Sequence, residues 1–107
     1  MELFLSSKRK GFCAKAIFDT ESNNFVVLKG ATVSENVARS EKFRGAKYIE
    51  KAREKYVVDG HVMEDVVFNS PSTAANFTTG RSTNGLITWK DKDGVKLKEL
   101  LADLTKN

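Results

Sequence analysis

Short stretches in which apolar and polar residues alternate mark the first half of the chain, and they predict strands. Residues 12–18 and 25–29 are two such stretches, and the turn-rich sequence DTESNN lies between them. We therefore predict that they pair as an antiparallel hairpin that ends at Gly30. Residues 62–68 are rich in valine and are predicted to form a further short strand or extended segment, after a turn at Asp59-Gly60.

Apolar residues recur at helical spacing in two other stretches. Residues 41–56 are predicted to form a helix capped by Ser40, because at about 100° per residue its apolar side chains share one face, which would lie against the core. Residues 96–104 are predicted to form the last helix, with a leucine stripe that is either core or a partner interface. The first stripe consists of Gly45, Tyr48, Ile49, Ala52 and Tyr56, and the second of Leu97, Leu100, Leu101 and Leu104.

The segment 70–94 carries the clearest local signals of the chain. Ser70-Pro71 predicts a helix start, because proline suits the first helical position and a serine hydroxyl can accept hydrogen bonds from the free amides. Gly80 predicts the end of this helix, since glycine readily takes the left-handed conformation. Asn84-Gly85 predicts a tight turn, and residues 86–90 predict a strand. The polar residues between Gly80 and Gly85 thus lie between two rigid elements, where binding residues often occur.

Together these elements predict a single domain spanning residues 1–107, of the α+β class. Strands and helices do not alternate as regular βαβ units, so we expect a small, mainly antiparallel sheet with about three helices packed on it. A chain of 107 residues with 40% hydrophobic content is large enough for one core.

Cys13 and His61 are the only residues of their types, which excludes an intrachain disulfide and a structural zinc site made of such ligands. We expect Cys13 to be a buried thiol and His61 to lie at a loop or strand edge, and we predict no cofactor and no metal. No apolar run approaches the roughly 20 residues that span a bilayer, and no signal peptide is recognisable at the N-terminus. We therefore expect a cytoplasmic protein that does not enter membranes.

The net charge of +4 is unevenly distributed. Residues 1–56 hold 12 Lys/Arg against 7 Asp/Glu, whereas residues 57–107 hold 6 against 7. A basic half suggests an anionic partner, although a mildly basic soluble surface accounts for a charge of this size as well.

In the predicted helix 41–56, four cations lie within about 80° of arc, and those at i, i+4 spacing repel one another. A phosphate backbone would neutralise this row, and a solvated helix face is the alternative. The four are Arg44, Lys47, Lys51 and Lys55.

Several short motifs resemble those of a known family. They are Ser70-Pro71-Ser72, Ala74-Ala75, Thr79-Gly80-Arg81-Ser82, Asn84-Gly85, Trp89-Lys90 and Asp93-Gly94, with Arg53-Glu54 and Asp59-Gly60 before them. On these motifs the chain resembles the uncharacterised domain often found C-terminal to GIY-YIG nucleases, and it is similar to the RAMA domain associated with restriction enzymes and adenine methylases. The resemblance covers residues 25–101 and is specific over 70–94.

Two features depart from the family pattern. Leu86 stands where an aromatic residue commonly follows the Asn-Gly pair, and the segment 60–68 is shorter than usual. For the family as a whole, the resemblance implies recognition of DNA, including modified DNA, beside restriction or repair enzymes.

The first functional hypothesis is a non-catalytic DNA-binding module. Arg81 is the leading candidate for a phosphate or guanine contact, because its planar guanidinium suits bidentate pairing. Free amides at the start of helix 71–79 would offer an anion site, and lysines would add phosphate contacts. The predicted DNA-binding residues are Arg81, Ser82, Thr83, Asn84, Ser72, Thr73, Lys90, Arg44, Lys47, Lys51 and Lys55. For Ser70, Gly80, Gly85 and Trp89 a purely structural role suffices. Without a ligand, Ser70 can cap a helix and Gly80 can end it, Gly85 can form a turn, and Trp89 can pack in the core.

Two other classes are the alternatives. In a protein-interaction module, the leucine stripe or an exposed Phe43 would dock a partner nuclease or methylase. An enzyme is the weakest hypothesis, because Asp91 and Asp93 lie in a turn signal and no nucleophile with a base and an orienting group is visible.

Overall fold

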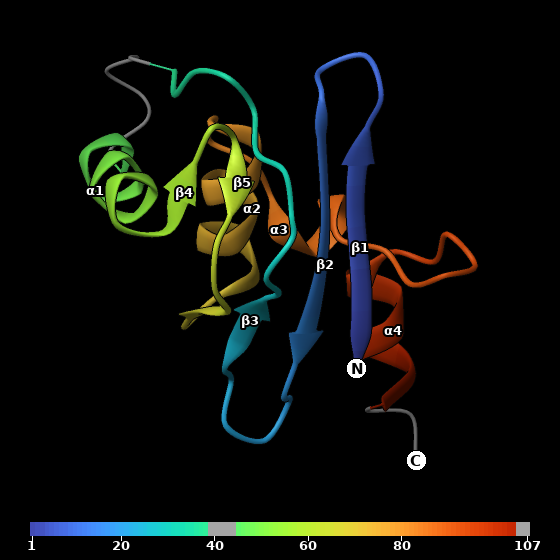
Figure 1. Cartoon of the computed structure of the whole chain (residues 1–107). Helices are drawn as coiled ribbons and strands as arrows, with labels where there is room; N and C mark the ends of the chain where they lie inside the picture. The colour runs from blue at the N-terminus through green and yellow to red at the C-terminus, as the bar shows by residue number, and fades with distance from the viewer. Residues whose placement is uncertain (39–44, 105–107) are drawn as a thin grey trace.

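Four strands form the main sheet of the computed structural model, which describes residues 1–38 and 45–104. The strand order is β1-β2-β3-β6, and every neighbouring pair is antiparallel (Figure 1). A small two-stranded sheet, β4-β5, lies beside it. The bounds are β1 (Glu2–Ser7), β2 (Phe12–Phe18), β3 (Phe25–Val27), β4 (Val57–Val58), β5 (His61–Val62) and β6 (Val66–Phe68). The α+β class and the mainly antiparallel sheet predicted from the sequence are confirmed.

The predicted hairpin is present as β2 and β3, which pair with Phe18 opposite Phe25. Burial alternates along β2, so that Phe12, Ala14, Ala16 and Phe18 face the core. Cys13 has the opposite parity and is exposed. The expectation of a buried Cys13 thiol is therefore wrong, because in a strand with one solvated face the neighbours of inward residues point to water.

Strand β1 was not predicted from the sequence. Leu3 and Leu5 supply its two buried positions and pair with Ala16 and Ala14 of β2. The predicted segment 62–68 is divided into β5 and β6 rather than forming one strand. Asp59 and Gly60, both with positive φ, make the predicted turn between β4 and β5.

Helix α1 (Ala46–Tyr56) is shorter than predicted, since Gly45 is its N-cap residue. The predicted cap at Ser40 and the first predicted turn lie outside the described residues. Ile49 of the predicted apolar stripe is buried, and Ala52 and Tyr56 are partly buried. Tyr48, however, is 56% exposed. Its place in the core stripe is therefore a wrong prediction.

Helix α2 (Pro71–Thr79) confirms both of its predicted ends. The Ser70 hydroxyl accepts a hydrogen bond from the Thr73 N–H at 3.1 Å, and Gly80 takes the left-handed conformation with φ 73°. The predicted Asn84-Gly85 turn and strand 86–90 are wrong. This segment is instead a one-turn helix, α3 (Gly85–Thr88), whose N-cap Asn84 accepts a hydrogen bond from the Leu86 N–H at 3.0 Å.

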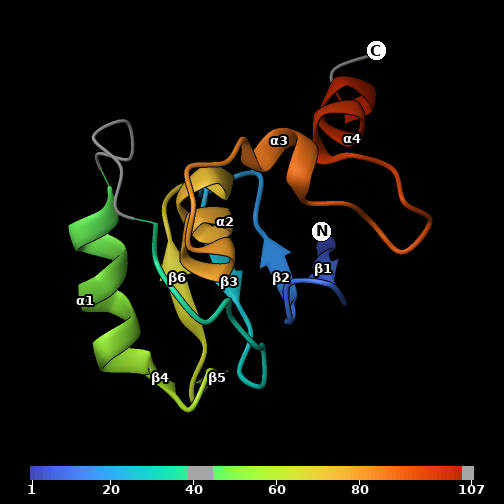
Figure 2. The ribbon, with the colours of Figure 1, turned by 90° about the horizontal axis from the view of Figure 1, so that it is seen from above.

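Helix α4 (Leu97–Leu104) follows the turn 91–94 as predicted. The exposure of its leucine stripe increases along the helix, because Leu97 is fully buried whereas Leu104 is 56% exposed. In Figures 1 and 2 α2 lies over the main sheet, while α1 and α4 lie at opposite ends of the molecule. No helix in the described part of the chain has the length and apolarity needed to cross a membrane.

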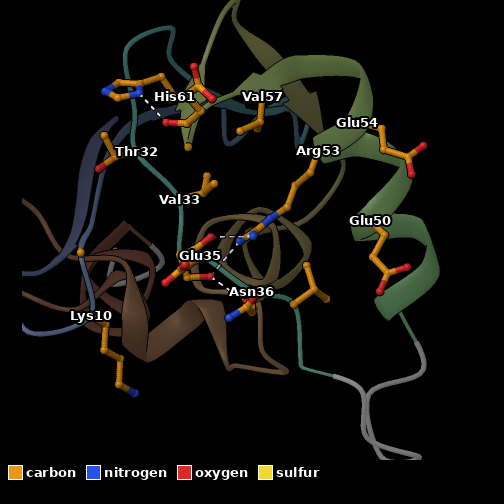
Figure 3. A pocket seen from close by; sticks show the side chains of 15 residues that line it. Lys10, Thr32, Val33, Glu35, Asn36, Glu50, Arg53, Glu54, Val57 and His61 are labelled. Carbon is orange, nitrogen blue, oxygen red and sulfur yellow. Dashed lines mark hydrogen bonds between the residues drawn. The ribbon is translucent and has the colours of Figure 1, made fainter.

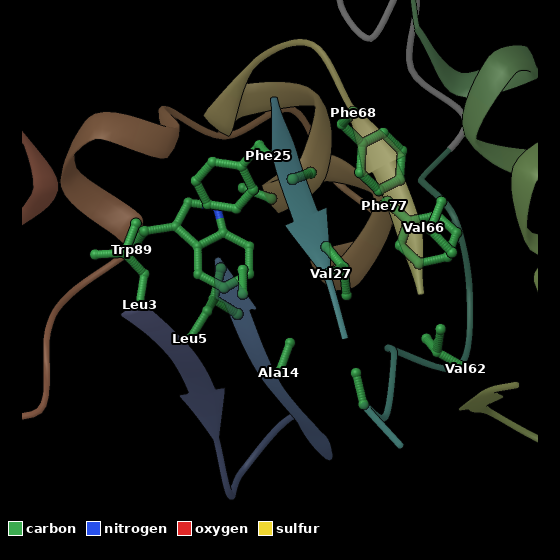
Figure 4. Packing of buried hydrophobic residues seen from close by; sticks show 14 of the residues in the cluster. Leu3, Leu5, Ala14, Phe25, Val27, Val62, Val66, Phe68, Phe77 and Trp89 are labelled. Atoms are coloured by element: carbon green, nitrogen blue, oxygen red, sulfur yellow. The ribbon is translucent and has the colours of Figure 1, made fainter. Parts of the chain in front are cut away.

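The core fills the space between the sheet and α2 (Figure 4). Trp89 is fully buried, and its ring centroid lies 4.9 Å from that of Phe25. Phe77 of α2 packs on Phe68 of β6 with centroids 5.1 Å apart. The indole N–H of Trp89 donates to the Pro71 carbonyl at 3.0 Å, so this large side chain also holds the start of α2 in place.

Candidate functional site

The polar loop between α2 and α3, residues 81–84, has a firmly held backbone. The Arg81 N–H donates to Thr79 Oγ1 at 3.3 Å, and the Thr83 N–H donates to Asn76 Oδ1 at 2.8 Å. Just after the loop, the Gly85 N–H donates to Ser72 Oγ at 3.0 Å. The loop therefore runs back along the surface of α2, from its C-terminal end towards its first turn.

The four loop residues differ in how much of their chemistry the fold already uses. Asn84 caps α3, and the Thr83 hydroxyl donates to Asn76 Oδ1 at 3.1 Å. Arg81 and Ser82 are exposed, and neither side chain has a partner among residues 1–38 and 45–104. Arg81 and Ser82 are therefore the two loop side chains that remain available to a ligand.

The start of α2 is not the open anion site that the sequence predicts. The Thr73 amide is already bonded to Ser70 Oγ. The Ser72 amide lies against Gly85, where an added Cβ would come within 2.5 Å of Ser72 N. The premise that both amides are free is therefore wrong, because α3 packs directly on this helix start.

Helix α1 presents three exposed lysines, Lys47, Lys51 and Lys55. At 100° per residue, Lys47 and Lys51 lie about 160° from the buried Ile49, so the row faces away from the core. The Lys55 Nζ also lies 5.2 Å from the centroid of the Tyr56 ring. Arg44, the fourth predicted cation of this row, lies outside the described residues.

Arg53 lies on the inner side of α1 and has a structural role. Its guanidinium donates to the Phe77 carbonyl at 2.8 Å and 3.0 Å, to the Ser34 carbonyl at 2.8 Å and to Ser34 Oγ at 3.0 Å. A longer bond of 3.3 Å reaches the Thr78 carbonyl. Burial lowers the pKa of Arg53. Figure 3 shows its side chain reaching from α1 towards the segment that carries Glu35 and Asn36.

Two grooves flank α1, and their charges differ. The first, which we call the acidic groove, lies between α1 and residues 32–37 (Figure 3). Its lining holds four carboxylates, from Glu35, Glu50, Glu54 and Asp59, against the two cations Lys10 and Arg53. Because Arg53 is already bonded to carbonyl groups, the acidic groove is poorly suited to a phosphate.

The second groove, which we call the neutral groove, has no charged residue among the lining residues that lie within 1–38 and 45–104. It lies between α1, α2 and the edge strand β6, and its volume is about 520 Å³. Asn76 belongs to its wall and also holds Thr83, so the Thr83 end of the 81–84 loop lies next to this wall. The lining residues are Asn24, Gly45, Tyr48, Ile49, Val67, Phe68, Asn69, Thr73 and Asn76.

Lys90 is not brought together with the other predicted cations. It is exposed and exchanges backbone hydrogen bonds with Phe4 of β1, at 2.6 Å and 3.0 Å. Strand β1 is the edge opposite β6, about 14 Å away across three strand spacings. The neutral groove and Lys90 therefore lie at opposite edges of the sheet.

Sequence reasoning missed Tyr48 and Asn76 as site candidates. Tyr48 was assigned to the core because its spacing from Ile49 and Ala52 fits an apolar stripe. Asn76 is seven residues from Thr83, and no local pattern links them. The exposed fraction of Tyr48 and the double hydrogen bond of Asn76 appear only when the helices are placed against each other.

Comparison with known proteins gives one result. No curated protein and no solved structure matches the chain. The family described as "Domain of unknown function (DUF4357)" matches residues 4–101, which run from β1 to α4. Because the match covers most of the chain, this protein belongs to the DUF4357 family of domains of unknown function.

Proposed function

We propose that the chain is a non-catalytic DNA-binding module. The observation that carries the proposal is the outward row of Lys47, Lys51 and Lys55 on α1, beside a groove whose described lining residues are uncharged. Thr83 of the 81–84 loop is bonded to Asn76 in the wall of this groove, and Arg81 of the same loop is exposed. Cations without carboxylates between them form the electrostatic pattern that a phosphate backbone neutralises.

The dimensions of the row suit a polynucleotide. Lys47 and Lys55 are eight residues apart, which corresponds to about 12 Å along a helix. One DNA strand carries a phosphate every 3.4 Å of helix axis, so the row spans about three to four phosphates. Its lysines repel one another at i, i+4 spacing, and bound phosphates would relieve this repulsion.

Arg81 is proposed to make the most specific contact. Its backbone is held by Thr79, so little ordering of the main chain would be needed on binding. The guanidinium fork can pair with a phosphate or with the O6/N7 edge of guanine, and the exposed Ser82 hydroxyl can add a hydrogen bond. Thr83 and Asn84 hold the loop in position and would therefore contribute to DNA binding only indirectly. Arg44 stays a predicted contact.

The resemblance of the 70–94 segment to domains beside GIY-YIG nucleases, and to the RAMA domain, favours the same role. It suggests recognition of modified DNA in a restriction or repair context, with a separate nuclease or methylase as the catalytic partner. A cytoplasmic location and the lack of a reaction of its own stay predictions. Robust DNA cleavage by the pure protein with a divalent metal would contradict a non-catalytic role.

A salt titration of duplex affinity tests the proposal. Each neutralised phosphate should contribute a slope of about −0.9 to log K against log salt concentration. Arg81→Ala should weaken binding while the thermal midpoint stays within about 2 °C of wild type, as for a surface change. The matched control is Lys98→Ala, which removes an equal charge from the exposed face of α4, at the other end of the molecule.

Three outcomes would refute the assignment. The first is the absence of duplex binding at low salt. The second is unfolding of the Arg81→Ala variant, which would make Arg81 structural. The third is an equal loss of affinity in Lys98→Ala, which would show that only net charge matters.

A protein-interaction module is the second candidate, favoured by exposed apolar residues at the α3–α4 end. Leu86, Ile87 and Leu104 are 37%, 46% and 56% exposed, and α3 contacts α4. This surface would dock a partner nuclease or methylase. Binding of such a partner that is insensitive to salt and lost in Ile87→Asp would favour this candidate, whereas steep salt dependence of DNA affinity favours the first.

A further inference from the structure

We propose that the neutral groove receives an unpaired nucleobase, with the Tyr48 ring as its stacking platform. The inference rests on the proposed DNA-binding function and assigns a ligand to one part of that surface. Tyr48 lines the groove and is 56% exposed, although it is a large aromatic residue next to the buried Ile49. Base–aromatic stacking is the usual way in which proteins hold bases that are not paired.

The rest of the groove lining suits a partly apolar ligand. Ile49 and Phe68 provide an apolar floor, and Val67, which is 59% exposed, stands on the β6 side. The volume of about 520 Å³ lies within the range of small-molecule sites, about 300–1,000 Å³. A nucleobase can stack on Tyr48 and contact this floor with its faces.

Polar groups in the wall can read the edge of a base. Asn76 Oδ1 accepts both the N–H and the hydroxyl of Thr83. Because a backbone N–H can only donate, these bonds identify the oxygen, and they leave the Asn76 amide nitrogen as the side-chain group without a partner among the described residues. Asn24 and Asn69 add further amides to the lining. Amide donors and acceptors match those on the edges of bases.

Charge places the phosphates next to this groove rather than in it. The described lining residues are uncharged, which suits a neutral base. Lys51 and Lys55 follow Tyr48 at i+3 and i+7, so they share one side of α1 with it. Glu50 and Glu54 lie on the other side, in the lining of the acidic groove. A nucleotide seated here would therefore have Lys51 and Lys55 beside its backbone, with Glu50 and Glu54 turned towards the acidic groove, which is why a nucleobase is favoured over an apolar peptide.

The test compares two duplexes that differ at one position. In one, 2-aminopurine is paired with thymine, and in the other it lies opposite an abasic site and is unpaired. Wild-type protein should bind the second duplex more tightly, on the order of tenfold, and should quench the fluorescence of the unpaired 2-aminopurine by stacking. Tyr48→Ala should abolish the preference and the quenching while keeping the affinity for the paired duplex. Tyr48→Phe, which retains the ring, should preserve both.

Val58→Ala is the matched control, because Val58 is 58% exposed and lies outside the groove. It should leave the preference unchanged. Equal affinity of wild type for the two duplexes, with normal salt dependence, would overturn the base site and leave DNA binding intact. If neither duplex binds, both the base site and the proposed function fail. If Tyr48→Ala keeps the preference, the base is held elsewhere and the base site is refuted. The exposed Tyr48 and Val67 side chains in the neutral groove would then be available to a protein partner.

Discussion

Arg53 offers a strong test of what holds α1 to the rest of the fold. Its guanidinium crosses from α1 to the C-terminal end of α2 and to the segment 33–38. Gly80 is packed into the same place, since an added Cβ would come within 2.6 Å of Ser34 Oγ. Removing Arg53 should therefore break the hydrogen bonds by which its single side chain joins these three segments.

The size of the effect follows from the groups left behind by Arg53→Ala. The carbonyls of Ser34 and Phe77 would lose their charged donor, whereas the Thr78 carbonyl keeps the hydrogen bond from the Ser34 N–H at 2.9 Å. A buried acceptor without its partner costs about 1–3 kcal/mol. Because Arg53 is only half-buried, water can reach part of the vacated space, so the lower end applies to each carbonyl. We expect a loss of about 2 kcal/mol in the free energy of unfolding, out of roughly 5–15 kcal/mol for a domain.

Urea denaturation at neutral pH measures this loss. Lys51→Ala removes a positive charge from the outer face of the same helix and should change the free energy of unfolding by no more than about 0.5 kcal/mol. Arg53→Lys keeps the charge but not the planar fork, and it should recover about half of the loss. A loss below about 1 kcal/mol for Arg53→Ala would show that the hydrogen bonds contribute little net stability, and the reasoning would then be refuted.

Three further predictions concern other parts of the fold. Trp89→Ala should cost about 3–5 kcal/mol in urea unfolding, because the ring is fully buried against Phe25, and Trp89→Phe should cost clearly less. Gly85→Ala should cost about 1–3 kcal/mol, since its Cβ would come within 2.5 Å of the Pro71 carbonyl oxygen, and an unchanged urea midpoint would contradict this close approach. The pKa of Asp19 is lowered because its carboxylate accepts hydrogen bonds, first from the Glu21 N–H. Its stabilising contribution is therefore present above the ordinary value of 3.8 and lost as the pH falls through the lowered folded-state pKa. The urea midpoint of Asp19→Ala should be lower than that of wild type at about pH 6 and should fall less on acidification; parallel pH profiles would argue against it.

Part of the candidate interface was predictable from the sequence. Lys47, Lys51 and Lys55 were expected on one side of a helix, and Arg81 in a polar loop, and the structure has all four exposed. Whether they bind DNA stays a prediction. The amides of Ser72 and Thr73 were misjudged, because the sequence does not show that α3 folds back onto the start of α2. Lys90 was grouped with the others only by its charge.

Features that depend on residues a few positions apart follow from the sequence alone. The cap at Ser70, the left-handed Gly80 and the β2–β3 hairpin belong to this class, because each is decided by local backbone preferences and short hydrogen bonds. The family is likewise a property of the sequence, matched over residues 4–101.

Packing between distant segments sets which surfaces face water and which of two local conformations is formed. Asn84-Gly85 is compatible with a tight turn and with a helix cap, and the cap is formed where Gly85 packs on Pro71. Tyr48 has the spacing of a core residue, yet α1 packs at the edge of the sheet, and Ile49 alone on that helix is fully buried among the described residues. Periodicity gives the angle between side chains on a helix, whereas the direction of the core depends on packing between segments distant in the chain.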